Sequence, residues 1–271
     1  MRGLKIMEAI LKYPGGKWRI AEWIISFFPQ HKVYCEPFFG SGAVFFKKSP
    51  AYIETINDIN GDIVNLFRVC RENPIELSEI IALTPFAREE FCNCYERSEN
   101  PIEQARRTLV RYHQSFGTTN SCKKSWRNVQ VAGGPRTATM WGYLPETILK
   151  VCTRLKDAQI ENIDALTLIE RYNDKDTLLY LDPPYPLSLR KRNIYQNELS
   201  DEYHVKLLQL IKRSKSKIVI SSYNNDLYND MLEDWDTAEK ETFAQMGLKR
   251  VEKIWANFKL NVNSQISINN L

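Results

Sequence analysis

The segment Asp182-Pro183-Pro184-Tyr185 combines residue types that can hold an amino group of a nucleobase. It follows an apolar run, Leu178 to Leu181, that predicts a strand buried on both faces of a sheet. The prolines restrict the backbone, and their carbonyl groups can accept hydrogen bonds. A carboxylate beside a carbonyl can accept both hydrogens of an exocyclic amine, while an adjacent aromatic ring stacks on the base. An ordinary proline turn after a strand is the alternative.

An aromatic amine is a poor nucleophile because its lone pair is delocalised into the ring. If Asp182 and the Pro183 carbonyl fix both N–H bonds, the nitrogen turns towards a tetrahedral form with its lone pair directed at an electrophilic methyl group. This is catalysis by positioning and electrostatics, and it requires no metal.

A glycine-containing turn, Glu36 to Gly42, follows the first predicted strand. Gly40 and Gly42 allow a tight turn and let a ligand approach backbone amides near the start of a helix. The pattern is not G-x-G-x-x-G, because Phe45 stands where the third small residue would be. A plain strand-to-helix turn explains it equally well.

Asp58 ends the next predicted strand, eighteen residues beyond Gly40. Rossmann-like folds keep an acid near this position for a ribose hydroxyl pair. Alternatively, Asp58 is the N-cap of the helix that follows Asn60.

Strands and helices alternate over residues 32–73 and again from 145 to the tail, after a helix over 16–28 that Pro29 ends. The tail predicts two strands around a turn at Met246 and Gly247. This pattern predicts an α/β fold with a doubly wound, mostly parallel sheet, in which ligands bind at the carboxyl ends of the strands. We expect a discontinuous domain over residues 1–74 and 150–271, with a mainly helical insert over 75–149.

The predicted insert contains a helix over 101–113, followed by a long polar loop to about residue 146. Residues 100–157 hold ten Lys and Arg against three acids, in a chain whose net charge is only +4. Such a local surplus favours a phosphate-rich partner. A solvated helix face is the alternative.

Composition narrows the class of protein. The 271 residues are 43% hydrophobic, which is ample for a folded core, and no run approaches eighteen apolar residues. With no secretory signal at the N-terminus, we expect a cytoplasmic protein without a membrane segment. The six cysteines form no C-x-x-C pair and only three histidines occur, so we expect no metal site.

Four motifs together resemble the Dam-like, D12 class DNA methyltransferases that modify N6 of adenine. These are Y-P-G-G-K at Tyr13–Lys17, E-P-F-F-G-S-G at Glu36–Gly42, N-D-I-N at Asn57–Asn60 and D-P-P-Y at Asp182–Tyr185, in that family's order. The resemblance implies S-adenosyl-L-methionine as cofactor and the Rossmann-like fold of methyltransferases that use it. It also implies a DNA-recognition lobe between the glycine turn and D-P-P-Y.

The resemblance further implies roles for single residues. Asp182, Pro183 and Pro184 would face the target amine and Tyr185 would stack on the flipped base, with Ser221-Ser222-Tyr223 shaping that pocket. Asp164 would lie near the cofactor's adenine, although a helix N-cap is an equal alternative for it. The other cofactor contacts would be Tyr13 and Lys17 at the methionine end, Glu36, Phe38, Gly40 and Gly42 lining the pocket, Asp58 on the ribose, and Asp182.

In the lobe, the basic residues suit phosphates or guanine edges, and Trp126 suits groove contact or wedging beside an extruded base. The usual recognition segment of the GATC-specific members is not found here, and the lobe looks more like those of phage or prophage enzymes. The predicted DNA-binding residues are Lys123, Lys124, Arg127 and Arg136.

The sequence therefore predicts a site-specific methyltransferase acting on N6 of a flipped adenine in double-stranded DNA. It would belong to a restriction-modification system, with a possible cognate endonuclease, or be carried by a phage. Alternatives are cytosine-N4 methylation, a DNA-binding protein without turnover on the same fold, and an RNA or protein substrate.

Overall fold

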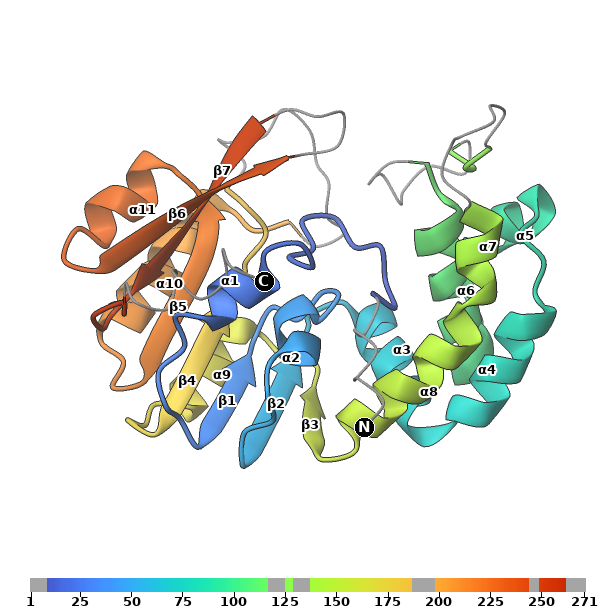
Figure 1. The fold of residues 1–271 in the computed structure, drawn as a ribbon, viewed down its shortest axis with the longest axis horizontal. Helices are drawn as coiled ribbons and strands as arrows, with labels where there is room; N and C mark the ends of the chain where they lie inside the picture. Colours follow the sequence, from blue (N-terminus) through green and yellow to red (C-terminus); the bar gives the residue numbers. More distant parts are fainter. Residues whose placement is uncertain (1–8, 117–124, 129–136, 187–197, 244–248, 262–271) are drawn as a thin grey trace, which may run out of the picture. The chain divides into compact units, whose positions relative to one another are not determined.

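The computed structural model describes residues 9–116, 125–128, 137–186, 198–243 and 249–261 (Figure 1). The chain forms two compact units. The sheet unit comprises residues 17–59 and 158–271, and the helical unit comprises residues 1–16 and 60–157. The helical unit is broader than the predicted insert over 75–149, since the N-terminal segment and the helix after Asn60 belong to it.

The described residues of the sheet unit form seven strands in the order β3-β2-β1-β4-β5-β7-β6 (Figure 1). The first five pair in parallel, whereas β7 is antiparallel to both β5 and β6. The predicted α/β fold with a mostly parallel sheet is confirmed. The strands are β1 (Val33–Glu36), β2 (Ile53–Asn57), β3 (Ala158–Glu161), β4 (Thr177–Leu181), β5 (Lys217–Tyr223), β6 (Asp236–Phe243) and β7 (Lys249–Ala256).

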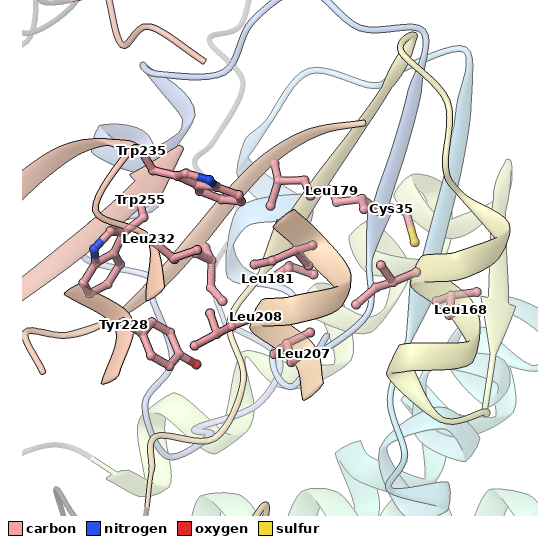
Figure 2. Packing of buried hydrophobic residues seen from close by; sticks show 14 residues of the cluster. Cys35, Leu168, Leu179, Leu181, Leu207, Leu208, Tyr228, Leu232, Trp235 and Trp255 are labelled. Atoms are coloured by element: carbon pink, nitrogen blue, oxygen red, sulfur yellow. The ribbon is translucent and has the colours of Figure 1, made fainter. Parts of the chain in front are cut away.

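Three helices cover one face of this sheet. Figure 2 shows their apolar side chains meeting Leu179 and Leu181 of β4 in a cluster that also contains Trp255 of β7. Each begins at a residue whose side chain accepts backbone N–H groups, which satisfies donors that the helix leaves unpaired. The helices are α9 (Ala165–Arg171), α10 (Asp201–Lys212) and α11 (Asp226–Met231), capped by Asp164, Ser200 and Asn225.

Two short helices complete the described part of the sheet unit, α1 (Ala21–Ile25) and α2 (Ala43–Lys47), and they pack on each other. The helix predicted over 16–28 is therefore much shorter than its apolar spacing indicated. The two tail strands form as predicted, but the turn at Met246 and Gly247 lies outside the described residues.

The helical unit packs α6 and α8 against α3 and α4. Asn60 caps α3 and Asn100 caps α6, where Pro101 occupies the first helical position. Part of the predicted polar loop is helical, because α7 and the start of α8 fall within it. The helices are α3 (Gly61–Glu72), α4 (Pro74–Leu83), α5 (Arg88–Asn93), α6 (Pro101–Gln114), α7 (Thr137–Gly142) and α8 (Leu144–Leu155).

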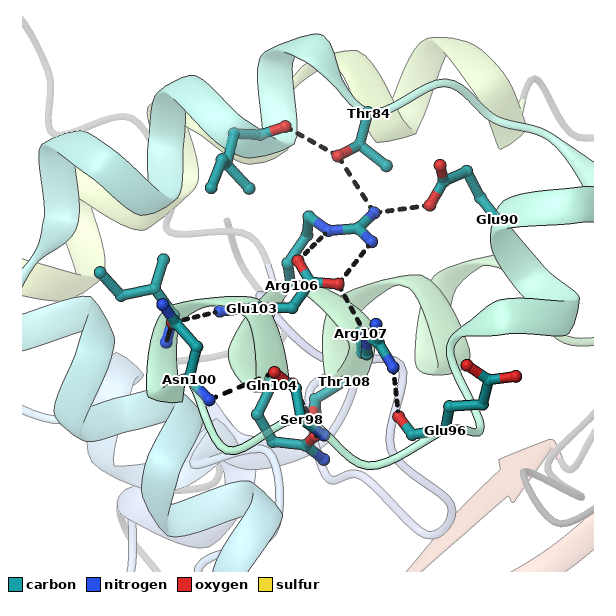
Figure 3. A network of polar contacts seen from close by, with 12 residues as sticks. Thr84, Glu90, Glu96, Ser98, Asn100, Glu103, Gln104, Arg106, Arg107 and Thr108 are labelled. Atoms are coloured by element: carbon teal, nitrogen blue, oxygen red, sulfur yellow. Dashed lines mark hydrogen bonds and ion pairs between the residues drawn. The ribbon is translucent and has the colours of Figure 1, made fainter.

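An ion-pair network crosses the helical unit at α6 (Figure 3). Arg106 binds Glu103 through two nitrogens, at 2.7 and 2.8 Å, and Glu90 at 2.6 Å, while Arg107 binds Glu103 at 2.6 Å. These hydrogen bonds, above all the one from Arg106, lower the pKa of Glu103 to about 2. Arg106 and Arg107 were counted in the basic surplus of residues 100–157, but both are paired with acids of the same unit. One of these acids, Glu90, lies outside residues 100–157.

Candidate active site

The candidate site lies where the order of parallel strands reverses, between β1 and β4. In open α/β sheets, ligands bind outside the carboxyl ends of the strands at this switch point. The glycine turn Glu36–Gly42 leaves the end of β1, and Asp182 leaves the end of β4. Two of the predicted motifs therefore meet at the expected edge of the sheet unit.

Side-chain alternation decides which residues face the site. Leu179 and Leu181 point into the helix-covered cluster, so their neighbours on β4 project from the opposite face. On that face the Tyr180 hydroxyl lies 2.9 Å from Ser221 Oγ of β5. By the same alternation the face also carries Tyr34 and Glu36 of β1, Asp182 after β4, and Tyr223 of β5.

The Asp182 carboxylate is anchored through one oxygen. Lys17 Nζ donates to Oδ1 at 2.8 Å, and Ser221 Oγ donates to the same atom at 3.1 Å. Among the described residues, none donates a hydrogen bond to Oδ2. The side chain of Asp182 is 19% exposed.

Tyr185 is held by its hydroxyl and by its ring. The hydroxyl accepts from Lys17 Nζ at 2.8 Å and donates to the two carboxylate oxygens of Glu252 at 3.3 and 3.2 Å. Its ring centroid lies 4.3 Å from that of Tyr223, with an interplanar angle of 35°. The D-P-P-Y tyrosine is therefore fixed by contacts from β5 and β7.

Lys17, Asp182 and Glu252 form a buried charge cluster. Burial opposes the charge on Lys17, but the two carboxylates outweigh it and raise the pKa of the ammonium well above its usual value. Burial raises the pKa of Asp182 and of Glu252, and Lys17 opposes both shifts. Lys17 Nζ lies 3.4 Å from Glu252 Oε1, so one cation serves two acids.

The glycine turn requires left-handed backbone at two positions. Gly40 has φ 50° and Gly42 has φ 66°, and a Cβ on Gly42 would lie 2.4 Å from the Phe39 ring. The Gly40 N–H donates to Asp58 Oδ2 at 2.8 Å, which ties the turn after β1 to the end of β2. The N-cap alternative for Asp58 is wrong, since Asn60 caps the following helix.

Glu36 and Phe38 occupy different environments. Glu36 is 2% exposed and accepts a hydrogen bond from Tyr34 at 2.7 Å. Burial raises the pKa of Glu36 to about 8, although the Tyr34 hydroxyl opposes the shift. Phe38 is half-buried and packs against the helix-covered cluster.

Asn57 joins three strand ends, a role that the sequence did not indicate. Its amide nitrogen donates to the carbonyl oxygens of Pro37 and Ile163 at 2.9 and 3.1 Å, and its amide oxygen accepts from Ile163 N at 2.9 Å. Asn57 is 1% exposed and lies at the end of β2. A polar side chain is needed there because the backbone groups that it contacts are buried and require hydrogen-bond partners.

Asp164 acts as a helix N-cap, one of its two predicted roles. Its Oδ1 accepts from the N–H groups of Leu166 and Thr167, and its Oδ2 accepts from the Tyr203 hydroxyl at 2.9 Å. The predicted contact with the cofactor's adenine stays a prediction.

Tyr13 belongs to the helical unit, where its ring stacks on Tyr112 at 5.6 Å. In the same unit Arg127 donates to the Ser115 carbonyl at 3.2 Å, and burial lowers the pKa of Arg127. Burial and the Arg127 charge lower the pKa of Lys12 to about 8. The predicted DNA-binding residues Lys123, Lys124 and Arg136 lie outside the described residues.

Trp126 is half-buried in the helical unit. Its Nε1 donates to Gln114 Oε1 at 3.3 Å, and the guanidinium of Arg88 lies 4.7 Å from its ring centroid. These contacts hold the indole within the unit, so the predicted wedging beside a base requires it to leave them.

Within the described ranges, no group of three or more His, Cys, Asp or Glu side chains comes together in a way that could hold a metal ion. In the same ranges, no helix has the length and apolar character needed to cross a membrane.

A mostly parallel α/β sheet with D-P-P-Y and a glycine turn at its switch point is typical of one class, the nucleobase amino-methyltransferases, and the family comparison agrees. The model of the D12 class N6 adenine-specific DNA methyltransferases matches residues 13–246. The chain belongs to this family and is an adenine-specific DNA methyltransferase.

Curated relatives carry matching names. A DNA adenine methylase from Haemophilus influenzae is 30% identical over 186 residues, which cover 65% of this chain and 63% of that protein. The Type II methyltransferase M1.LlaDCHI from Lactococcus lactis subsp. cremoris is 27% identical over 262 residues, 90% of each chain. The Type II methyltransferase M.MjaIII from Methanocaldococcus jannaschii is 24% identical and covers 84% of this chain and 88% of that protein.

One solved structure, precorrin 8W decarboxylase from Methanobacterium thermoautotrophicum, aligns with this protein over 91% of this chain and 94% of the decarboxylase chain. The TM-score is 0.40 and the identity 9%, which is too low to inform fold or function.

Proposed function

We propose that the chain transfers the methyl group of S-adenosyl-L-methionine to N6 of an adenine flipped out of double-stranded DNA, at a specific site. The observation that carries this proposal is the orientation of Asp182. One carboxylate oxygen is anchored by Lys17 and Ser221, and the other accepts no hydrogen bond from the residues that the structure describes.

Asp182 Oδ2 accepts one N6–H of the target adenine, and the Pro183 carbonyl accepts the other. Both hydrogens are then held in one plane, and the nitrogen lone pair is directed at the incoming methyl group. Since Oδ1 is fixed, the carboxylate need not reorganise as positive charge develops on the amine. After transfer, the methylated amine carries a positive charge and loses one N–H proton, and Asp182, which would already accept a hydrogen bond from that N–H, can take the proton up.

Tyr185 stacks on the flipped base once one face of its ring is uncovered, since Tyr185 is only 5% exposed in this structure. Its ring is held against Tyr223, and its hydroxyl is fixed by Lys17 and Glu252. A ring that is ordered before the base arrives loses little freedom on binding, which favours affinity for the extruded nucleotide.

The residues at the switch point fit the cofactor. Asp58, at the end of β2, holds the glycine turn through Gly40 and occupies the position from which an acid can reach ribose hydroxyls. S-adenosyl-L-methionine supplies an electrophilic methyl group on a sulfonium. We assign the ribose to Asp58, the methionine end to Tyr13 and Lys17, and the pocket lining to Glu36, Phe38, Gly40, Gly42 and Asp164.

DNA recognition falls to the predicted insert over 75–149. Arg127 is the described member of its basic set, and Lys123, Lys124 and Arg136 complete the set. The names of the Type II relatives favour a restriction-modification context, with an endonuclease that cuts the same site when it is unmethylated.

The test is to incubate unmethylated duplex DNA with the protein and S-adenosyl-L-methionine, digest it to nucleosides and identify the products by mass spectrometry. We expect N6-methyladenine. Asp182→Ala should abolish it, whereas Asp230→Ala, which alters an exposed aspartate of the same unit, should leave the yield unchanged.

Two outcomes would contradict the proposal: N4-methylcytosine as the sole product, or full activity of Asp182→Ala. A preference for RNA over duplex DNA in a competition for labelled methyl groups would contradict the assigned substrate.

A further inference from the structure

We propose that Glu252 is a positioning residue for methyl transfer, acting through Tyr185 and Lys17 rather than by touching the base. The inference rests on the proposed function, since it assigns a task to a residue that borders the proposed site. Glu252 belongs to no motif in the sequence, and the topology of the sheet alone brings it there.

The antiparallel direction of β7 places Glu252 at the functional edge. Glu252 is the fourth residue of β7 and the first of that strand to pair with β5, where it lies opposite Tyr223, the last residue of β5. Residues directly opposite each other in an antiparallel pair project from the same face. A parallel strand would carry the start of its sequence to the other edge of the sheet, away from Asp182.

Glu252 contacts two of the residues that surround Asp182. Its carboxylate accepts the Tyr185 hydroxyl proton at 3.2 Å and lies 3.4 Å from Lys17 Nζ. Because Lys17 also donates to Asp182 Oδ1 and to the Tyr185 hydroxyl, Glu252 closes a ring of polar contacts around the ammonium. The ring fixes both the tyrosine that stacks on the base and the lysine that orients the carboxylate.

The burial of Glu252 indicates a specific role for its carboxylate. It is 3% exposed, and a buried carboxylate is costly unless its partners compensate. Lys17 already has Asp182 as a counter-ion, so Glu252 is a second acid beside the same ammonium. When Glu252 is ionised, its negative charge favours the positive charge that develops on the adenine amine during transfer.

The experiment compares Glu252→Gln and Glu252→Asp with wild type by single-turnover methyl transfer at saturating cofactor and DNA, together with steady-state KM values. Glutamine keeps an acceptor for Tyr185 and removes the charge, while aspartate keeps the charge. Glu239→Gln is the matched control, since Glu239 is an exposed glutamate of the same hairpin, paired with Lys253 at 3.5 Å.

We expect Glu252→Gln to lower the single-turnover rate by about tenfold to hundredfold, with both KM values within about twofold of wild type. Glu252→Asp should recover part of that rate, and Glu239→Gln should match wild type. Circular dichroism and the melting temperature confirm that the compared proteins are folded.

A wild-type single-turnover rate for folded Glu252→Gln would overturn the inference. So would equal losses for the glutamine and aspartate variants, because aspartate retains the charge. Asp182→Ala, assayed in parallel, separates the two proposals: if it is inactive while Glu252→Gln is normal, only the role of Glu252 fails. If Asp182→Ala is active, the proposed mechanism itself fails.

Discussion

Lys17 and Asp182 are separated by 165 residues, and their charged atoms lie 2.8 Å apart. The sequence assigned Lys17 to the methionine end of the cofactor. The structure adds a second contact, because the ammonium pairs with the carboxylate that we propose holds the target amine. The lysine of Y-P-G-G-K and the aspartate of D-P-P-Y thus form one electrostatic unit with Glu252.

The first prediction concerns the stability of this cluster. Lys17→Met keeps most of the side-chain volume but leaves two buried carboxylates without their cation. We expect the free energy of unfolding to fall by about 3–5 kcal/mol, the usual cost of breaking a buried pair. Urea denaturation at pH 8 measures it.

Lys32→Met is the control for that experiment, because Lys32 forms an exposed pair with Asp176 at 3.0 Å. It should barely move the urea midpoint. Glu252→Gln added to Lys17→Met should recover part of the lost stability. Equal midpoints for the two lysine variants would show that the buried cluster contributes nothing.

The second prediction concerns pH and Glu36. The pKa of Glu36 in the folded protein is raised to about 8, so between pH 4.5 and 8 the folded state binds a proton that the unfolded state has released. Stability therefore falls as pH rises through this window. Glu36→Gln carries no such proton and should lose this part of the slope.

The measurement is the free energy of unfolding of both proteins at pH 5 and pH 8. From pH 5 to pH 8, the free energy of unfolding of Glu36→Gln should rise relative to that of wild type by more than ~1 kcal/mol, since one pKa unit corresponds to about 1.4 kcal/mol. Parallel pH profiles would contradict the raised pKa.

The third prediction concerns acid and His113 of the helical unit. Burial lowers the pKa of His113 to about 3, and its Nε2 donates to the Ile10 carbonyl at 2.8 Å. Between pH 6.5 and 3 the unfolded state binds a proton that the folded state excludes. Stability is therefore lost as pH falls below about 6.5.

His113→Gln keeps a donor for Ile10 and removes the titration. Its stability relative to wild type should rise steadily from pH 7 to pH 4, as followed by the fluorescence of Trp141, whose ring lies 5.9 Å from that of His113. A constant difference across this range would show that His113 charges freely in the folded protein.

The fourth prediction concerns salt and DNA. Affinity for duplex DNA should fall steeply with added salt, because the basic lobe releases counterions from phosphates. If Arg127 contacts one phosphate, Arg127→Ala should weaken binding and reduce the slope of log K against log salt by about one.

Arg213→Ala serves as the control, since Arg213 is an exposed arginine of the sheet unit. It should leave the slope unchanged in fluorescence anisotropy titrations. If the affinity of the wild-type protein for DNA did not change with salt, the lobe would not contact the DNA phosphates.

Local patterns were sufficient for much of the fold. Apolar runs and turn residues predicted the seven strands that the structure describes, the last two from the turn at Met246 and Gly247, because hydrophobic periodicity and turn signals are carried by neighbouring residues. The local patterns gave wrong predictions in two segments. The spacing of apolar residues over 16–28 predicted a long helix where α1 has five residues, and a polar, glycine-containing segment concealed α7.

Charge counting along the chain was also incomplete. Arg106 and Arg111 belong to the basic stretch, yet they pair with Glu90 and Asp62, which lie earlier in the sequence. A window of sequence cannot show a counter-ion that folding brings from outside it.

The sequence by itself determined the family, the D-P-P-Y and glycine motifs, and their places at strand ends, because each depends on residues within a short stretch. Only the tertiary structure decided that Lys17 serves Asp182, that Asp58 holds Gly40, that Asn57 links three strand ends and that Glu252 stands beside Tyr185. Those contacts depend on strand order and direction. An antiparallel β7 next to β5 sets which face and which edge a side chain reaches, and such pairing is a property of the assembled sheet.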